Sequence, residues 1–134
     1  MRCPRSRDDG ARGQRGAAVV DFVLIALVLV PLLLGIIQVG LVMHVRNTLA
    51  AAAAEGARYG ATVDRGPTAG VARTRTQIGS ALAGRYAERV RGGWEMVDGL
   101  RLVVVRVHAA VPALGLLGPS LAFDVAGHAV AEAQ

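Results

Sequence analysis

The chain has 134 residues, which is room for one small domain and a membrane anchor. Apolar residues make up 53% of the chain but aromatic residues only 4%, a balance that favours a membrane segment and small-residue helix packing over a bulky soluble core. The net charge is +5, every basic residue is arginine, and the single cysteine, Cys3, excludes a disulfide framework within the chain and a cysteine-based zinc site.

Residues 1–16 form a basic leader. They carry five arginines against Asp8 and Asp9, and such an excess of positive charge beside an apolar segment predicts that the N-terminus stays in the cytoplasm. A nucleic-acid-binding arm is the rival interpretation. Because the arginines have no interleaved aromatic residues and precede an apolar run, we expect them to meet anionic lipid headgroups and no nucleic acid.

A long apolar run follows the leader. From Phe22 to Met43 the only strongly polar residue is Gln38. At about 1.5 Å per residue this run reaches roughly 33 Å, enough for a hydrocarbon core of about 30 Å, so we predict a transmembrane helix over residues 17–44. A cleaved secretory signal is the alternative, since the small residues 50–54 offer a cleavage site, but its apolar stretch is usually shorter.

Pro31 and Gly35 lie inside the predicted span. Proline removes a backbone hydrogen bond, which a membrane tolerates where neighbours re-satisfy the freed carbonyl. Two interpretations stay open: a tolerated kink in an anchor, or a helix that bends when it leaves lipid for a protein assembly.

The helical pattern continues past the span. Alanine is the strongest helix former and no breaker occurs before residue 64, so we expect one helix from about Ala18 to Val63. On it Ala52, Gly56 and Gly60 recur every four residues, a stripe that lets another helix approach closely, although alanine and glycine are common throughout this chain. Nearby, the spacing of Glu55 and Arg58 allows an ion pair.

A second helix is predicted from Thr68 to Arg91. Apolar residues recur there mostly every four positions, and Gly92-Gly93 is expected to end the helix. We therefore assign residues 45–92 to an extracytoplasmic helical stalk.

The remaining residues, 93–134, read as a small β-rich head. A Val/Leu-rich stretch is interrupted by Asp98-Gly99, a typical two-residue hairpin turn, and is closed by Pro112. The stretch 123–132 then alternates between apolar and polar residues. The predicted fold class is membrane-anchored α+β and pilin-like: a long N-terminal transmembrane and stalk helix, a second helix and a small antiparallel sheet.

Residues able to do chemistry are few. His108 and His128 are expected on neighbouring strands near Asp124, but a metal site needs more ligands than these provide. The simpler interpretation is that they are polar residues on the solvated face of the sheet. Ser80 and Ser120 have no nucleophile-elbow context. We therefore expect no enzyme activity, no metal site and no cofactor.

With these elements in place, the chain resembles the TadE-like family of the tight-adherence (Tad, or Flp-type) pilus system. Three stretches carry the resemblance: RGAAVVDFVLIALVLVPLLLGIIQVGLVMHVRN, then AAAAEGARYGA, and more weakly the Val/Ala-rich strands at the C-terminus.

The resemblance implies a minor pilin or pseudopilin that is made as a prepilin. A membrane prepilin peptidase would cleave after Gly16, leaving Ala17 as the new N-terminus with Asp21 as its fifth residue. Phe22 matches the aromatic residue that commonly follows, and Asp21 stands where the family usually has glutamate. The implied partners are the lipid bilayer, the peptidase, other pilins and the Tad inner-membrane assembly proteins.

The chemistry of Asp21 fits that role. Cleavage creates an amino group that is largely protonated at neutral pH, and Asp21 could neutralise such an amine on a neighbouring subunit. Burying either charge unpaired would cost several kcal/mol, so the pairing would favour one register. From the residues alone, the alternative is an acid at the start of a helix, stabilised by the helix dipole at the level of the headgroups.

The expected location is the bacterial cytoplasmic membrane, crossed once with the C-terminus outside, and the chain would assist assembly or enter a surface pilus. Two alternatives from other classes remain. One is an uncleaved bitopic adaptor whose outer α+β domain binds an envelope partner. The other is a secreted binding domain released near Ala54.

Overall fold

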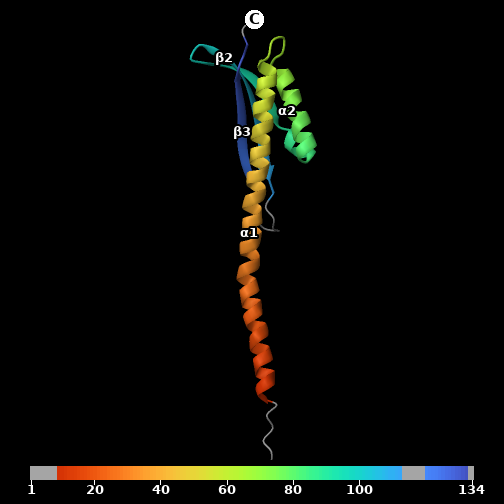
Figure 1. Cartoon of the computed structure of the whole chain (residues 1–134), viewed down its shortest axis with the longest axis vertical. Helices are drawn as coiled ribbons and strands as arrows, with labels where there is room; N and C mark the ends of the chain where they lie inside the picture. The colour runs from red at the N-terminus through yellow and green to blue at the C-terminus, as the bar shows by residue number, and fades with distance from the viewer. Residues whose placement is uncertain (1–8, 113–119, 133–134) are drawn as a thin grey trace, which may run out of the picture. The chain divides into compact units, whose positions relative to one another are not determined.

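The fold was analysed in a computed structural model that describes residues 9–112 and 120–132, with side chains from residue 17 onward. Cys3 and the first part of the predicted leader lie outside the described residues. The elements in chain order are α1 (Asp9–Ala61), α2 (Pro67–Ala81), the 3-10 helix η1 (Gly84–Ala87), β1 (Val90–Val97), β2 (Leu100–Val111) and β3 (Leu121–Val130). The predicted fold class is confirmed: a long apolar helix, a second helix and a three-stranded antiparallel sheet of order β1-β2-β3 (Figure 1).

Helix α1 runs without interruption through Pro31 and through the alanine-rich stretch that follows the apolar run. The chain divides into two compact units, one ending at Ile37 and the other beginning at Gln38. The first unit contributes the apolar part of α1. The second contains the remainder of α1, both other helices and the sheet.

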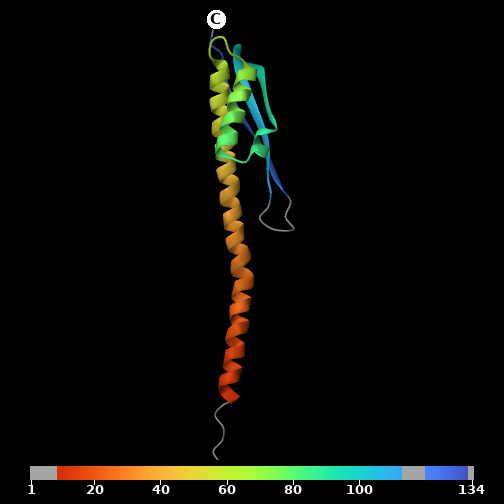
Figure 2. The ribbon, with the colours of Figure 1, turned by 90° about the vertical axis from the view of Figure 1, so that its right-hand side faces the viewer.

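Within the second unit both helices lie on one face of the sheet (Figure 2). Successive side chains of β2 point to opposite faces of the sheet, so the helices cover every second one. Its odd-numbered residues from Val103 to Val111 are all buried, as are Leu49 of α1 and Ile78 of α2. Fully burying a valine or leucine contributes roughly 1.5–3 kcal/mol, so this small apolar layer is the main source of stability.

The β1–β2 hairpin forms as the sequence predicts. Val97 pairs with Leu100, and the two residues between them, Asp98 and Gly99, have φ angles of 51° and 78°. Two consecutive positive φ angles are typical of a type I′ turn, whose twist matches that of the flanking strands. Strand β2 ends at Val111, directly before Pro112, which cannot donate to the sheet.

The prediction that the second helix continues to Arg91 is wrong. Helix α2 ends at Ala81, where Leu82 adopts an extended backbone and donates its N–H to the carbonyl of Ile78, 2.8 Å away. The chain then forms η1 and enters β1. The periodicity misled because Tyr86 and Val90 are buried, as a helix pattern requires, but they reach the core through a 3-10 turn and a strand.

Strand β3 approaches α1 very closely at Gly127. A Cβ atom added to this glycine would overlap the backbone of Ala53 and Ala54. The two elements can therefore touch backbone to backbone, because neither side supplies a large side chain at the crossing. Gly127 has an ordinary φ angle, so its role is steric.

This contact predicts that Gly127→Ala destabilises the second unit by about 1–3 kcal/mol, the usual cost of overpacking a tight site. The matched control is Gly79→Ala in α2, where an added Cβ has nothing within 4 Å. Replacing a helical glycine there should instead stabilise by up to about 1 kcal/mol. Denaturant unfolding of the full chain in detergent, followed by the fluorescence of Trp94, measures both. Equal effects of the two substitutions would contradict the tight crossing.

Candidate assembly surfaces

The first unit presents an apolar surface that no other described part of the chain covers. The most apolar 18-residue window of α1 has a mean hydropathy of 2.9, and none of it is buried. Phe22 is 71% exposed and Leu27 69%. Among the described residues this is the one helix long and apolar enough to cross a membrane. Since a helix apolar on all sides needs lipid or other helices around it, the surface is suited to membrane anchoring.

The predicted processing and registration residues all lie in α1. Gly16 and Ala17 are consecutive helical residues, and Asp21 and Phe22 follow within little more than one turn. Residues four apart share a face of a helix, so Ala17 and Asp21 lie on one side. Asp21 is exposed, and in the sequence it is the only charged residue between Ala17 and Ile37. Its carboxylate is therefore presented on the apolar surface.

The small-residue stripe of α1 packs against α2 of the same chain. A Cβ atom added to Gly70 of α2 would lie 2.6 Å from the carbonyl oxygen of Gly56, and one added to Gly56 would lie 2.7 Å from the carbonyl oxygen of Gly70. One added to Gly60 would lie 2.9 Å from the carbonyl oxygen of Gly66. We call this contact the helix seam. Its closeness requires small residues on both helices.

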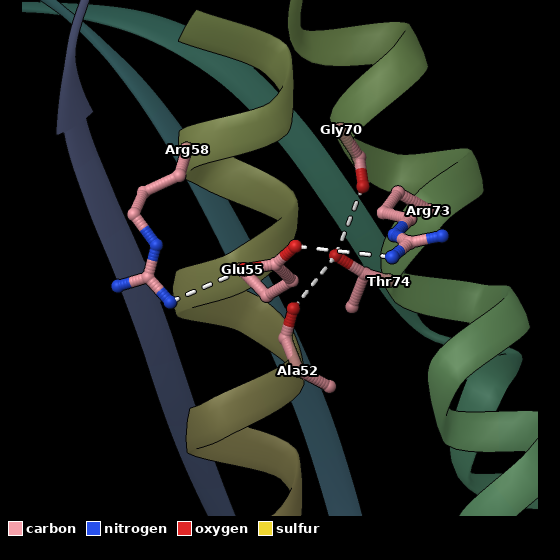
Figure 3. Close-up of polar contacts among 6 residues, drawn as sticks. All are labelled: Ala52, Glu55, Arg58, Gly70, Arg73 and Thr74. Atoms are coloured by element: carbon pink, nitrogen blue, oxygen red, sulfur yellow. Dashed lines mark hydrogen bonds and ion pairs between the residues drawn. The ribbon is translucent and has the colours of Figure 1, made fainter.

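Thr74 joins the two helices by a hydrogen bond inside the seam (Figure 3). Its hydroxyl lies 3.3 Å from the carbonyl oxygen of Ala52 and 2.9 Å from that of Gly70, so the single proton is shared between an interhelical and an intrahelical acceptor. Thr74 is fully buried and is the only buried polar side chain among the described residues. Ala52, the first residue of the stripe, thus belongs to the seam in two ways: its side chain is small and buried, and its carbonyl accepts the hydrogen bond from Thr74.

The rim of the seam is polar. Glu55 pairs with Arg58 at 3.3 Å, as its spacing predicts, and with Arg73 of α2 at 3.9 Å (Figure 3). The guanidinium groups of Arg65 and Arg73 lie 3.8 Å and 5.7 Å from the ring centre of Tyr59. Because these charged side chains are exposed or partly exposed, each ion pair contributes at most about 1 kcal/mol. The rim orients α2 on α1 and the buried seam holds it.

The sheet face opposite the helices carries the predicted histidines. His108 and Asp124 are cross-strand partners, with Nδ1 2.8 Å from the carboxylate oxygen. His128 pairs with Val104, four register positions from the His108–Asp124 pair and on the same face of the sheet. In the described part of the chain, no group of three or more His, Cys, Asp or Glu residues could hold a metal ion.

An open groove of about 750 Å³ lies beside the His108–Asp124 pair. Its lining includes four basic residues, Arg75, Arg89, Arg91 and Arg106, and two acidic ones, Glu88 and Asp124. Arg91 and Arg106 are opposite each other on β1 and β2, an arrangement that repels. Glu95 offsets part of this repulsion through an ion pair with Arg106 at 3.1 Å. The lining therefore holds more guanidinium groups than carboxylates, a balance that suits an anionic partner.

Comparison with known proteins bears on the first of these surfaces. Residues 16–58 match the family model described as TadE-like protein. The chain carries a TadE-like segment. The match begins at Gly16 and covers the first stretch on which the resemblance rests and most of the second, so the predicted resemblance is confirmed there. It ends before α2 and the sheet, and no curated protein and no solved structure matches the chain.

The TadE-like match associates the chain with the Tad pilus system. It covers most of α1 and leaves α2 and the sheet unmatched. The matched segment contains the exposed apolar surface, Asp21, and the seam residues Ala52 and Gly56 of α1; Gly60 lies beyond it. The TadE-like family is not a known enzyme family.

Sequence reasoning missed the α2 side of the seam. The signal was present, because Gly66, Gly70 and Thr74 recur every four residues, as Ala52, Gly56 and Gly60 do on α1. Two small-residue stripes of equal spacing, separated by one short turn, are typical of two antiparallel helices in close contact. The partner of the first stripe could have been found in the same chain.

The buried hydroxyl gives a testable prediction. Thr74→Val keeps the side-chain shape but removes the bond to Ala52, and we expect it to lower the free energy of unfolding by about 1 kcal/mol. Thr76→Val is the matched control. Thr76 lies on the exposed face of α2 and donates to the carbonyl of Ala72 at 3.1 Å, the same intrahelical bond that Thr74 makes to Gly70. Denaturant unfolding followed by Trp94 fluorescence compares them. A loss no greater for Thr74→Val than for Thr76→Val would show that the seam does not depend on this hydroxyl.

Proposed function

We propose that the protein is a single-pass, minor pilin-like subunit for assembly of a Tad/Flp-type pilus or a related secretion apparatus, made as a prepilin and processed after Gly16. The observation that carries the proposal is the extent of the family match. It starts at the proposed cleavage residue and follows α1 through its exposed apolar part into the helix seam.

The chemistry of the first turns of α1 supports this role. Cleavage after Gly16 would release the amino group of Ala17, and Asp21 would then be the fifth residue of the mature chain. An exposed carboxylate on an apolar helix is costly to bury alone, and a subunit that supplies an amine at the right level removes that cost. Asp21 thereby acts as a registration residue between neighbouring subunits, with Phe22 beside it as an apolar contact.

The proposed topology follows from the charges and the apolar helix. The basic leader, residues 1–16, stays in the cytoplasm, where a prepilin peptidase can reach it, and residues 17–44 cross the cytoplasmic membrane. Residues 45–134 lie on the other side. The proposed partners are the peptidase, other pilins and the Tad inner-membrane assembly proteins.

Processing is tested by measuring the mass of the N-terminal peptide. Co-expressed with a Tad prepilin peptidase, the wild-type chain should begin at Ala17, and Gly16→Leu should remain intact because the bulky side chain blocks the cleavage position. Gly13→Leu, a change at another leader glycine, should still be processed. If the wild-type chain stays intact while a major pilin is cleaved in the same cells, the protein is an uncleaved bitopic adaptor instead.

Registration is tested separately from cleavage. Asp21→Ala should lower the amount of the protein in sheared pili, or its cross-linking to other pilins, by more than tenfold, because an unpaired buried amine costs several kcal/mol. Asp21→Glu keeps the charge and should retain most of the assembly. Both variants are first confirmed to begin at Ala17. Full assembly of processed Asp21→Ala would remove Asp21 from the mechanism.

A further inference from the structure

The end of the sheet where β2 stops is tied to the apolar run of α1. The side-chain amide of Gln38 donates a hydrogen bond to the carbonyl oxygen of Pro112, with 3.2 Å between the atoms. Gln38 is the single strongly polar residue between Phe22 and Met43. The bond therefore connects the first residue after β2 to a position that the sequence assigns to the membrane.

The depth of Gln38 follows from helix geometry. Residues 17–44 number 28, and at about 1.5 Å each they span roughly 42 Å, the thickness of a bilayer that includes its headgroup layers (about 40–45 Å). Gln38 precedes His44 by six residues, which places it about 9 Å inside the outer boundary. Pro112, bonded to Gln38, must lie at a similar depth.

The burial of α1 side chains also indicates that the strand ends lie near the outer boundary of the membrane. Val42 packs against the core of the second unit, and Val45 is only 2% exposed, so the sheet already covers one side of the helix there. If the helix used its whole apolar run to cross the hydrocarbon, the strand ends would enter the lipid with it. If it ended its span at Ile37, about 31 Å from Ala17, the strand ends would rest on the lipid surface.

The side chains at this end of the sheet suit such a position. Leu121, opposite Val111 at the start of β3, is 50% exposed, and Ala122 beside it is exposed as well. Leu41 of α1, on the same side of the helix as Gln38, is 37% exposed. In the sequence, the fifteen residues from Ala109 to Phe123 contain no charged residue.

We propose that this strand-end surface, formed by Gln38, Leu41, Pro112, Leu121 and Ala122, is a second membrane contact that lies in the outer interface of the lipid bilayer. The proposal rests on the membrane topology stated under Proposed function. The partner is lipid, since the surface is apolar, lacks charge and continues from the spanning helix. Because exposed backbone groups are costly in lipid, the Gln38 amide has a defined role there: it satisfies the carbonyl that follows the last β2 residue.

A second membrane contact at the strand ends would fix the orientation of the second unit relative to the membrane. A helix anchored alone can rotate about its axis, whereas a unit held at both α1 and the strand ends meets the membrane with one side only. The open sheet face, with its arginine groove, is then presented in a fixed direction to neighbouring subunits. The distant Asp98-Gly99 turn, at the opposite end of β2, stays in water.

Depth-dependent fluorescence quenching of the full-length chain in phosphatidylcholine vesicles tests the proposal. In a Cys3→Ser background, an environment-sensitive dye is attached to Leu121→Cys or, because Leu121 is only 50% exposed, to its exposed neighbour Ala122→Cys. Leu29→Cys in the span is the positive control and Asp98→Cys in the hairpin turn is the negative control. Lipids carrying a spin label near the headgroup serve as shallow quenchers, and lipids labelled near the chain end as deep quenchers.

We expect shallow quenchers to remove most of the fluorescence at positions 121 and 122, deep quenchers to do so at position 29, and neither to affect position 98. Fluorescence at both 121 and 122 as insensitive as at 98, with position 29 quenched, would overturn the second contact and leave the anchor intact. An unquenched label at position 29 would instead overturn the membrane topology, and the second contact with it.

Discussion

Everything in this chain depends on a single helix that must satisfy two environments. From Val19 to Ile37, α1 exposes large apolar side chains on all sides, a surface that is stable only in lipid or among other helices. From Val45 onward the same helix buries small residues against α2 and the sheet. The change in side-chain size along α1, from Leu, Ile and Val to Ala and Gly, is what lets one uninterrupted helix serve as both anchor and core element.

The close packing of the second half of α1 limits how the protein can assemble. The stripe formed by Ala52, Gly56 and Gly60 would be a plausible contact with another subunit, but α2 of the same chain occupies it. Gly127 of β3 similarly brings the sheet against the helix backbone at Ala53. In the proposed assembly, contacts between subunits would therefore use surfaces that remain exposed, such as the apolar half of α1, where Asp21 lies, and the open sheet face with its arginine groove.

Much of this architecture could be predicted from the sequence, because the decisive signals are local. The span follows from an apolar run with one polar residue, and the hairpin from Asp98-Gly99 between Val-rich stretches. The end of α2 could not be predicted. Leu82, Tyr86 and Val90 keep a helical spacing, yet the backbone is already extended at Leu82, and Val90 pairs in the sheet with Val107, seventeen residues later. The close contacts at Thr74 and Gly127 depend in the same way on which distant segment arrives there.

The central claim is that α1 passes from lipid to protein and water between Ile37 and Arg46, with its C-terminal part outside the cell membrane. Reaction of single-cysteine variants with a membrane-impermeant maleimide in intact cells, again without Cys3, tests this directly. Positions 22–37 should be unreactive, and the exposed positions Arg46, Asn47 and Arg58 should react from outside. Labelling within residues 22–37, or protection of all three exposed positions, would contradict the claim.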